Sequence, residues 1–226
     1  MSNIKKYLPL IVLLVAIVAD QWLKFYIKLN FTLGESVRVF DWFQILFVEN
    51  PGMAFGWELG SKLFLTIFRI IVSGAVIWYL IKLMKDSYKL GYQIVITLIL
   101  AGAVGNIIDC VCYGVIFSES TYWATAEFMP EVGYASWFMG KVVDMFYFPL
   151  FTFPDWMPLL GGEIFFSPIF NLADSYITVA IFILIIFYHK DFNDTIERYT
   201  KRHETQDTRH ETQDTRHKTR DVRYEK

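Results

Sequence analysis

The chain has 226 residues, of which 54% are hydrophobic and 18% aromatic, and its formal net charge is −2. This composition is more apolar than that of an ordinary soluble domain and favours a membrane protein, and it gives no sign of a nucleic-acid partner. All four histidines lie at or after His189, so the preceding body has none for a Ser-His triad or a zinc site. Carboxylate, lysine, serine and cysteine side chains remain as candidate chemical groups, and we expect no metal and no cofactor.

The first long apolar run covers about residues 7–27. The hydrocarbon core of a bilayer is about 30 Å thick, so a spanning helix needs about 20 such residues. Lys5 and Lys6 precede the run, as in a secretory signal peptide, but Asp20 interrupts its far end and no small-x-small cleavage site follows. We therefore predict a retained transmembrane helix.

The segment from residue 28 to 61 connects the first two apolar runs. Polar residues alternate with β-branched and aromatic residues from Ser36 to Trp42, which predicts a short strand or hairpin on the membrane surface. Pro51 and Gly52 then predict a turn. The amide of Asn50 fits either a functional site or a well-formed turn, and the local pattern does not decide between them.

Three further runs, at about residues 63–84, 92–112 and 169–188, are also long enough to span a bilayer. Backbone polar groups in lipid must be satisfied within the segment, so each run is expected to be a helix. Cys110 and Cys112 are the only cysteines. Two residues apart, they point to different faces of a helix, and we interpret them as packing residues.

Lysine and arginine residues predict the orientation. They lie before the first run, between the second and third runs and after the fourth, whereas residues 113–168 contain only Lys141. The positive-inside rule then places both termini in the cytoplasm and residues 28–61 and 113–168 outside. The predicted fold class is an all-α membrane protein with four transmembrane helices, a small extracytoplasmic β element and a long outer loop.

Two regions are predicted from composition alone. Residues 113–168 are rich in aromatic rings, which favour the headgroup region, so this outer loop either covers a site at the membrane surface or serves only as an anchor. Within residues 191–226, the heptad Arg-His-Glu-Thr-Gln-Asp-Thr recurs from Arg202 onward, and it has no apolar seam of the kind that a coiled coil needs. We predict a polar, low-complexity cytoplasmic tail that follows a membrane domain of residues 1–190.

Four carboxylates from distant parts of the chain are expected at the outer membrane surface: Asp20, Asp109, Asp144 and Asp174. An ionisable group at the edge of hydrocarbon is costly, so it is usually paired or solvated in a cavity. Two carboxyls that share one proton can hydrolyse a peptide bond, because the ionised one activates water while the protonated one polarises the carbonyl. Nearby amides such as Asn106 and Asn171 would orient the acids or hold substrate.

Five segments, in order, resemble the signature motifs of the lipoprotein signal peptidases (signal peptidase II). They are Asp-Gln-Trp-Leu-Lys at 20–24, Asn-Pro-Gly-Met-Ala-Phe-Gly at 50–56, Gly-Ala-Val-Gly-Asn-Ile-Ile-Asp at 102–109, Val-Val-Asp-Met at 142–145 and Phe-Asn-Leu-Ala-Asp-Ser at 170–175. Each motif is short. Five of them in order, each at the expected membrane boundary, make the resemblance specific.

The resemblance implies an aspartyl endopeptidase of the bacterial inner membrane, with its active site at the outer face. Its substrates would be diacylglyceryl-modified prolipoproteins, cut before the lipidated cysteine, and membrane lipid and globomycin-type inhibitors would be further partners. By motif match, the catalytic pair would be Asp144 and Asp174. The supporting residues would be Asp20, Lys24, Asn50, Asn106, Asp109 and Asn171.

Two features depart from the family pattern. Cys110 stands where the family commonly has an arginine, so no arginine contact is implied at that position. Residues 115–140 form a longer insert than is usual. This insert would add a lid, a lipid-binding surface or only a surface elaboration.

Three other functions compete with a peptidase of this kind. A transporter or proton-relay protein also uses intramembrane carboxylates, but it predicts acids distributed through the membrane depth. A non-catalytic anchor or assembly factor would have its acids neutralised by Lys24 and Arg69. A serine-lysine peptidase would use Lys24, but no serine has an evident place beside that lysine.

Overall fold

The computed structural model describes residues 3–51, 58–159, 161–165 and 168–201. Its elements, in which η marks a π-helical segment, are α1 (Asn3–Asn30), β1 (Ser36–Phe40), β2 (Phe43–Asn50), α2 (Glu58–Lys85), α3 (Leu90–Ile108), η1 (Asp109–Tyr113), α4 (Gly114–Ile116), β3 (Val142–Tyr147), β4 (Phe151–Thr152), β5 (Ile164–Phe165), β6 (Ile169–Phe170), α5 (Leu172–Ile183) and η2 (Leu184–Tyr188). The chain forms two compact units, Met1–Ile181 and Phe182–Lys226. The sheets and the predicted site residues belong to the first.

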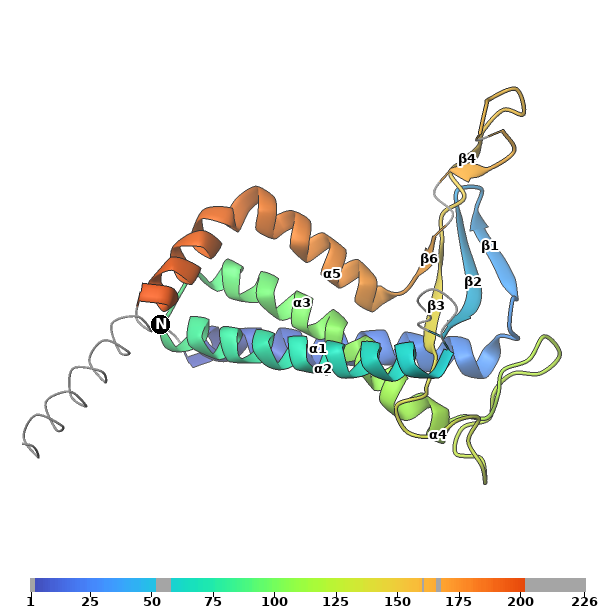
Figure 1. Ribbon diagram of the computed structural model, residues 1–226, viewed down its shortest axis with the longest axis horizontal. Coiled ribbons are helices and arrows are strands. Elements are labelled where there is room, and N and C mark those ends of the chain that lie inside the picture. The colour runs from blue at the N-terminus through green and yellow to red at the C-terminus, as the bar shows by residue number, and fades with distance from the viewer. Residues whose placement is uncertain (1–2, 52–57, 160, 166–167, 202–226) are drawn as a thin grey trace, which may run out of the picture. The chain divides into compact units, whose positions relative to one another are not determined.

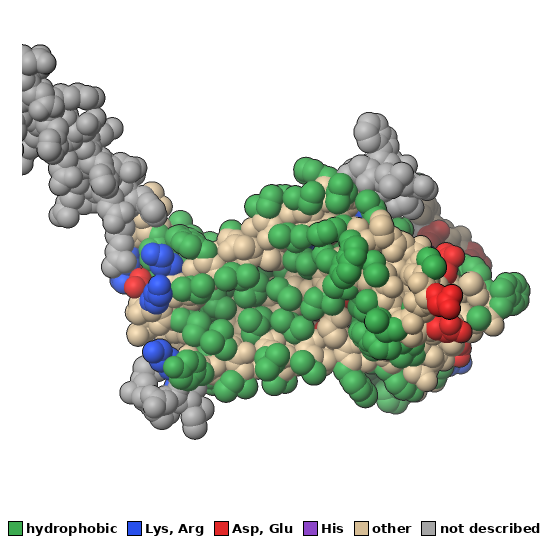
Figure 2. Space-filling model, turned by 90° about the horizontal axis from the view of Figure 1, so that it is seen from below, with side chains coloured by type: hydrophobic (Ala, Val, Ile, Leu, Met, Phe, Trp, Pro, Cys, Tyr) green, Lys and Arg blue, Asp and Glu red, His purple; other side chains and the backbone are tan. Residues whose placement is uncertain are grey.

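Four helical stretches within the described residues are long and apolar enough to cross a membrane: Lys5–Asn30, Lys62–Lys85, Leu90–Ile116 and Leu172–Lys201. They confirm the predicted spans. Figure 2 shows hydrophobic side chains covering the middle of the face in view, with acidic side chains gathered toward the end where the sheet lies. An apolar surface of this extent matches a lipid environment, because soluble monomers rarely expose large contiguous apolar patches.

Helix α3 is the most buried of the four spans and packs against α1 and α2. Two glycines let it approach its neighbours closely. A Cβ on Gly102 would lie 2.3 Å from the carbonyl oxygen of Ala173, and one on Gly105 would lie 2.6 Å from Oδ2 of Asp20. Small residues of this kind permit close helix contacts in membranes. Here they bring the polar groups of α1, α3 and α5 within hydrogen-bond range.

A four-stranded antiparallel sheet, in the order β1-β2-β3-β6, lies at the end of the helices away from the N-terminus (Figure 1). The β1–β2 pair confirms the hairpin predicted from the alternation after Ser36. In the β2–β3 ladder, Val48 pairs with Asp144 and Glu49 with Val143. The segment predicted as a long outer loop therefore supplies strand β3, which carries Asp144 into the sheet.

The fourth span begins slightly later than its predicted start near residue 169. Ile169 and Phe170 pair with β3 as strand β6, and α5 begins at Leu172. Helical structure then continues to Lys201, beyond the predicted start of the tail at residue 191. The heptad repeat from Arg202 onward lies outside the described residues.

The insert at 115–140 packs against the sheet and the end of α1. Phe117 and Ala126 share a buried hydrophobic cluster with Phe47 and Met145. The backbone N–H of Ala126 donates to the carbonyl of Lys28 at 3.2 Å, and that of Leu33 donates to Thr121 at 2.9 Å. These contacts make the insert part of the hydrophobic core at this end of the protein. The insert is therefore not only a surface elaboration.

Candidate active site

All the predicted site residues meet at the junction between the helices and the sheet. Asp20 and Lys24 come from α1, Asn106 from α3 and Asp109 from η1. Asn50 ends β2, Asp144 lies in β3, and Asn171 and Asp174 stand at the start of α5. Hydrogen bonds and ion pairs connect them in one network. The acids are thus gathered in one cluster, whereas the proton-relay alternative predicted acids spread through the membrane depth.

Asp144 is almost fully buried, with 4% of its surface exposed. Its Oδ1 accepts a hydrogen bond from Nδ2 of Asn171 at 2.7 Å, and the side chain of Asn50 also hydrogen-bonds to it. Burial and, secondly, the nearby negative charge of Asp174 raise the pKa of Asp144 to about 7, although the hydrogen bonds from Asn171 and Asn50 act in the opposite direction. Asp144 is therefore suited to hold a proton near neutral pH.

Asp174 is held by a capping box at the N-terminus of α5. Its backbone N–H donates to Oδ1 of Asn171 at 2.9 Å, and its Oδ2 accepts from the backbone N–H of Asn171 at 3.3 Å. This reciprocal pair ends the extended segment at Asn171 and starts the helix after it. Nδ2 of Asn106 donates to Oδ1 of Asp174 at 2.8 Å, so both carboxylate oxygens are engaged.

Asn106 and Asn171 link the two aspartates to each other and to Lys24. Oδ1 of Asn106 accepts from Nζ of Lys24 at 2.9 Å and from Nδ2 of Asn171 at 3.1 Å. A lysine ammonium can only donate, so the amide oxygen of Asn106 must face it, and Nδ2 is left to donate to Asp174. Asn171 contacts both Asp144 and Asp174. The two amides therefore hold the carboxyl groups in one arrangement.

A fully buried ion-pair layer lies on the other side of Asn106. Nζ of Lys24 is 3.0 Å from Oδ2 of Asp20 and 2.8 Å from Oδ2 of Asp109, and none of the three side chains is exposed. Both carboxylates also accept a hydrogen bond from a backbone N–H. Asp20 accepts from the N–H of Ala173 at 2.9 Å and Asp109 from the N–H of Val143 at 3.3 Å. Each donor immediately precedes one of the two candidate aspartates.

The sequence predictions missed two polar residues of this layer. Nε2 of Gln21 donates to Oδ2 of Asp20 at 3.1 Å and to Oδ1 of Asp109 at 3.0 Å. Its Oε1 accepts from the hydroxyl of Tyr113 at 3.1 Å. Gln21 lies inside the first motif, between Asp20 and Lys24, and this position could have indicated that it takes part in the polar network.

A second buried ionic cluster, formed by Lys28, Glu49, Ser120 and Lys141, was also missed. The carboxylate of Glu49 pairs with the ammonium of Lys28 and, at 3.0 Å, with that of Lys141. The hydroxyl of Ser120 accepts from Lys28 at 2.9 Å and donates to Glu49 at 3.0 Å. Burial raises the pKa of Glu49, but the two ammonium groups outweigh that effect and hold the pKa below its usual value. The available signal was that Lys28 directly follows the first apolar run and Glu49 directly follows the apolar stretch 45–48.

Arg69 brings a guanidinium to the position where the expected arginine is replaced by Cys110. Nη1 of Arg69, on α2, lies 3.4 Å from the sulfur of Cys110. Both Cys110 and Cys112 are free thiols. Within the described residues, no group of three or more His, Cys, Asp and Glu side chains is arranged to hold a metal ion.

A family model described as signal peptidase (SPase) II matches residues 12–190. The chain belongs to the signal peptidase II family. A lipoprotein signal peptidase of Porphyromonas gingivalis is 52% identical over 184 residues, which cover 79% of this chain and 80% of that protein. A lipoprotein signal peptidase of Amoebophilus asiaticus is 35% identical, over 82% of this chain and 79% of that protein.

The fold is also similar to that of solved membrane enzymes. A bacterial membrane enzyme solved in meso at 2.3 Å resolution has a TM-score of 0.55 and 26% identity, over 82% of this chain and 90% of that one. Membership of this family, together with the four candidate membrane spans, makes the chain a multi-pass membrane peptidase that removes signal peptides from prolipoproteins.

Proposed function

We propose that this chain is an aspartyl endopeptidase in which Asp144 and Asp174 form the catalytic pair. The observation that carries the proposal is the position of Asn171, whose side chain hydrogen-bonds to both residues. The side chain of Asn171 joins the carboxyl of Asp144 to the backbone of Asp174, and the backbone N–H of Asn171 donates to the carboxylate of Asp174, so the two acids are held close together in a largely buried site. There they can share one proton, as aspartyl hydrolysis requires.

The environments of the two acids support a division of roles. The pKa of Asp144, raised to about 7 by burial and by the charge of Asp174, favours its protonated form. Asp174 accepts hydrogen bonds from two amide groups, which suits an ionised carboxylate. Asp174 would therefore take a proton from the attacking water while Asp144 donates its proton to the scissile carbonyl. The proton held by Asp174 then passes to the leaving amine as the peptide bond breaks.

The supporting residues would hold the two carboxyl groups in a fixed orientation. Asn106 and Asn171 orient the carboxyl groups, and Asn50 adds a hydrogen bond to Asp144. Lys24 neutralises the two carboxylates that hold the backbone beside the pair. These groups supply positioning before substrate arrives, which is a large part of the catalytic advantage of an enzyme site.

The substrate is proposed to be a diacylglyceryl-modified prolipoprotein that is cut immediately before its lipidated cysteine. The site would face the outer side of the inner membrane, with both termini in the cytoplasm, as the distribution of basic residues favours. Exposed aromatic rings on the hairpin support a position at the membrane interface. Phe40 and Trp42 stack with their centroids 5.4 Å apart, and Trp42 stacks on Phe148 at 6.1 Å. Globomycin-type cyclic peptides would bind in the same site.

The test is a gel-shift assay of prolipoprotein processing with Asp144→Asn and Asp174→Asn. Each variant should lose nearly all cleavage while it still accumulates in the membrane, because the amide keeps the shape of the side chain but cannot exchange the proton. Asp41→Asn is a matched control, since Asp41 is 90% exposed on the same side of the protein. Near-normal cleavage by either dyad variant would overturn the catalytic assignment.

A further inference from the structure

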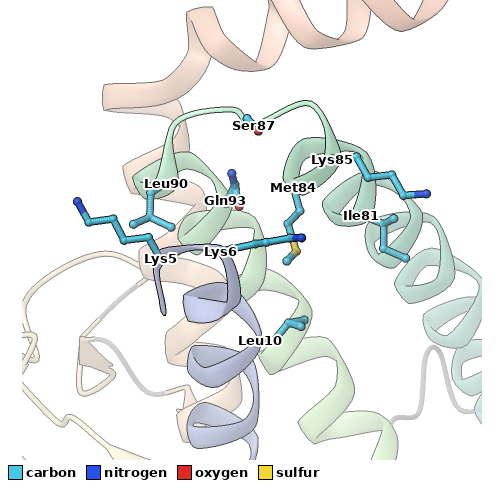
Figure 3. A pocket seen from close by; sticks show the side chains of 9 residues that line it. All are labelled: Lys5, Lys6, Leu10, Ile81, Met84, Lys85, Ser87, Leu90 and Gln93. Carbon is cyan, nitrogen blue, oxygen red and sulfur yellow. The ribbon is translucent and has the colours of Figure 1, made fainter. Parts of the chain in front are cut away.

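A cavity lies at the end of the helices away from the aspartates. Its volume is about 710 Å³, and it is formed by the beginning of α1, the end of α2 and the beginning of α3 (Figure 3). Lys5 is 15 residues before Asp20 on α1, which corresponds to about 22 Å along the helix. The cavity is therefore separate from the candidate active site.

The rim of this cavity is cationic. Among the described residues that line it, Lys5, Lys6 and Lys85 are basic and none is acidic. In the part of the chain that the structure describes, no carboxylate forms an ion pair with any of the three lysines. Figure 3 shows the side chain of Lys6 extending toward Met84, with Lys5 and Lys85 on either side. Three ammonium groups around one opening favour a ligand with negative charge.

The walls of the cavity are mainly apolar, and Ser87 and Gln93 are the uncharged polar residues that line it. Leu10 projects from α1, and Ile81 and Met84 project from α2. Leu10 and Ile81 are also 46% and 45% exposed, so the walls continue into the outer surface of the spans. A membrane-spanning helix lies in the headgroup region near its end and among the acyl chains farther along. Charge at the rim and apolar walls beneath it match the two parts of a lipid.

We propose that this cavity binds an anionic phospholipid of the membrane leaflet opposite the aspartate site. The headgroup phosphate would accept hydrogen bonds from the lysine ammonium groups, and one acyl chain would lie along Leu10, Ile81 and Met84. Basic pockets between transmembrane helices are suited to such headgroups, because each lysine near an anionic lipid adds favourable electrostatic energy. A free phosphate would satisfy the lysines but leave the apolar walls without an occupant.

Native mass spectrometry of the full-length protein in non-ionic detergent tests this proposal. The probes are phosphatidylglycerol, phosphatidylcholine with the same acyl chains, and glycerol 3-phosphate. Phosphatidylglycerol should bind at least about tenfold more tightly than phosphatidylcholine, and glycerol 3-phosphate should not compete at equal concentration. Lys6→Gln/Lys85→Gln should weaken phosphatidylglycerol binding about tenfold or more, given the electrostatic contribution of each lysine.

Three further variants distinguish a lipid bound in the cavity from general attraction to surface charge. Lys89→Gln/Lys190→Gln removes the same charge from exposed lysines that do not line the cavity, and it should change binding less than about twofold. Leu10→Trp fills the apolar part while it keeps every lysine, and it should also weaken binding. Ile81→Trp repeats that test from another helix. Equal losses in both lysine pairs, or wild-type binding in both tryptophan variants, would overturn the proposal.

Discussion

Asp20 accepts a hydrogen bond at 2.9 Å from the backbone N–H of Ala173, which lies 153 positions later in the chain. Asp109 makes the equivalent contact with the N–H of Val143. Ala173 and Val143 directly precede Asp174 and Asp144, and Lys24 joins the two accepting carboxylates. One buried lysine thus ties together the backbone segments that carry both candidate catalytic residues.

Replacement of Lys24 should uncouple these segments. Lys24→Met leaves two buried carboxylates without their cation, and breaking a buried pair in this way costs about 3–5 kcal/mol. We expect a lower thermal midpoint, measured by tryptophan fluorescence in detergent, and loss of prolipoprotein cleavage. Asp20→Asn/Lys24→Met/Asp109→Asn removes all three charges and should regain part of the stability. Lys190→Met is the exposed control, and an equal effect there would contradict the structural role of Lys24.

The pH dependence of cleavage should report the proton on Asp144. Its pKa is raised to about 7, so a mechanism that needs the protonated form loses rate as the pH rises through about 7. The hydrogen bond from Asn50 lowers this pKa. Asn50→Leu should therefore move the alkaline limb of the kcat/KM profile to higher pH. An unchanged limb in a variant that still folds would show that another group titrates there.

The same pKa shift has a consequence for stability. Above the ordinary carboxyl pKa of 3.8 the unfolded chain releases the Asp144 proton, whereas the folded chain keeps it up to about pH 7. Stability contributed by this group is therefore fully present below about pH 4 and is lost as the pH rises toward 7. Asp144→Asn has no such proton, so its thermal midpoint relative to the parent should increase across this window and level off above it. A constant difference between the two proteins would contradict the raised pKa.

Glu49 should be required for stability although it is outside the aspartate pair. Glu49→Gln leaves the buried ammonium of Lys28 without its carboxylate, at a cost of about 3–5 kcal/mol. Because Glu49 pairs with Val143 in the β2–β3 ladder, cleavage should also fall. Glu119→Gln is a matched control, since Glu119 contacts the same Lys141 at 3.7 Å but is 67% exposed. It should change stability by less than about 1 kcal/mol. Equal thermal midpoints for the two variants would refute the importance of the cluster.

The Arg69 and Cys110 pair can be tested by exchange. Cys110→Arg puts a larger, positively charged side chain into a buried site beside Arg69. Overpacking, which costs about 1–3 kcal/mol, and repulsion between the two guanidinium groups should both lower the thermal midpoint. Arg69→Ala/Cys110→Arg removes the competing guanidinium and opens space, and it should recover stability relative to Cys110→Arg alone. A double variant no more stable than Cys110→Arg would show that the two positions are independent.

The sequence by itself determined the four spans, the β1–β2 hairpin and eight of the polar residues that meet between the helices and the sheet, but not Gln21 or Tyr113. These features depend on local properties, such as the length of an apolar run, period-two alternation and short motifs at the ends of helices. Asp20, Asp109 and Asp174 could be identified in this way, because a charged group at the edge of a hydrophobic segment is costly unless it is paired or solvated.

Only the tertiary structure decided how those polar groups are paired. It shows Asn171 as both the cap of α5 and the link between Asp144 and Asp174, and it shows the Lys28–Glu49–Lys141 cluster beneath the insert. A buried donor or acceptor must find a partner, but the partner is chosen by the folding of distant segments onto one another. The contact between Asp20 and Ala173 has no local signal in either segment, because it exists only after Gly102 and Gly105 let α3 pack closely against α1 and α5.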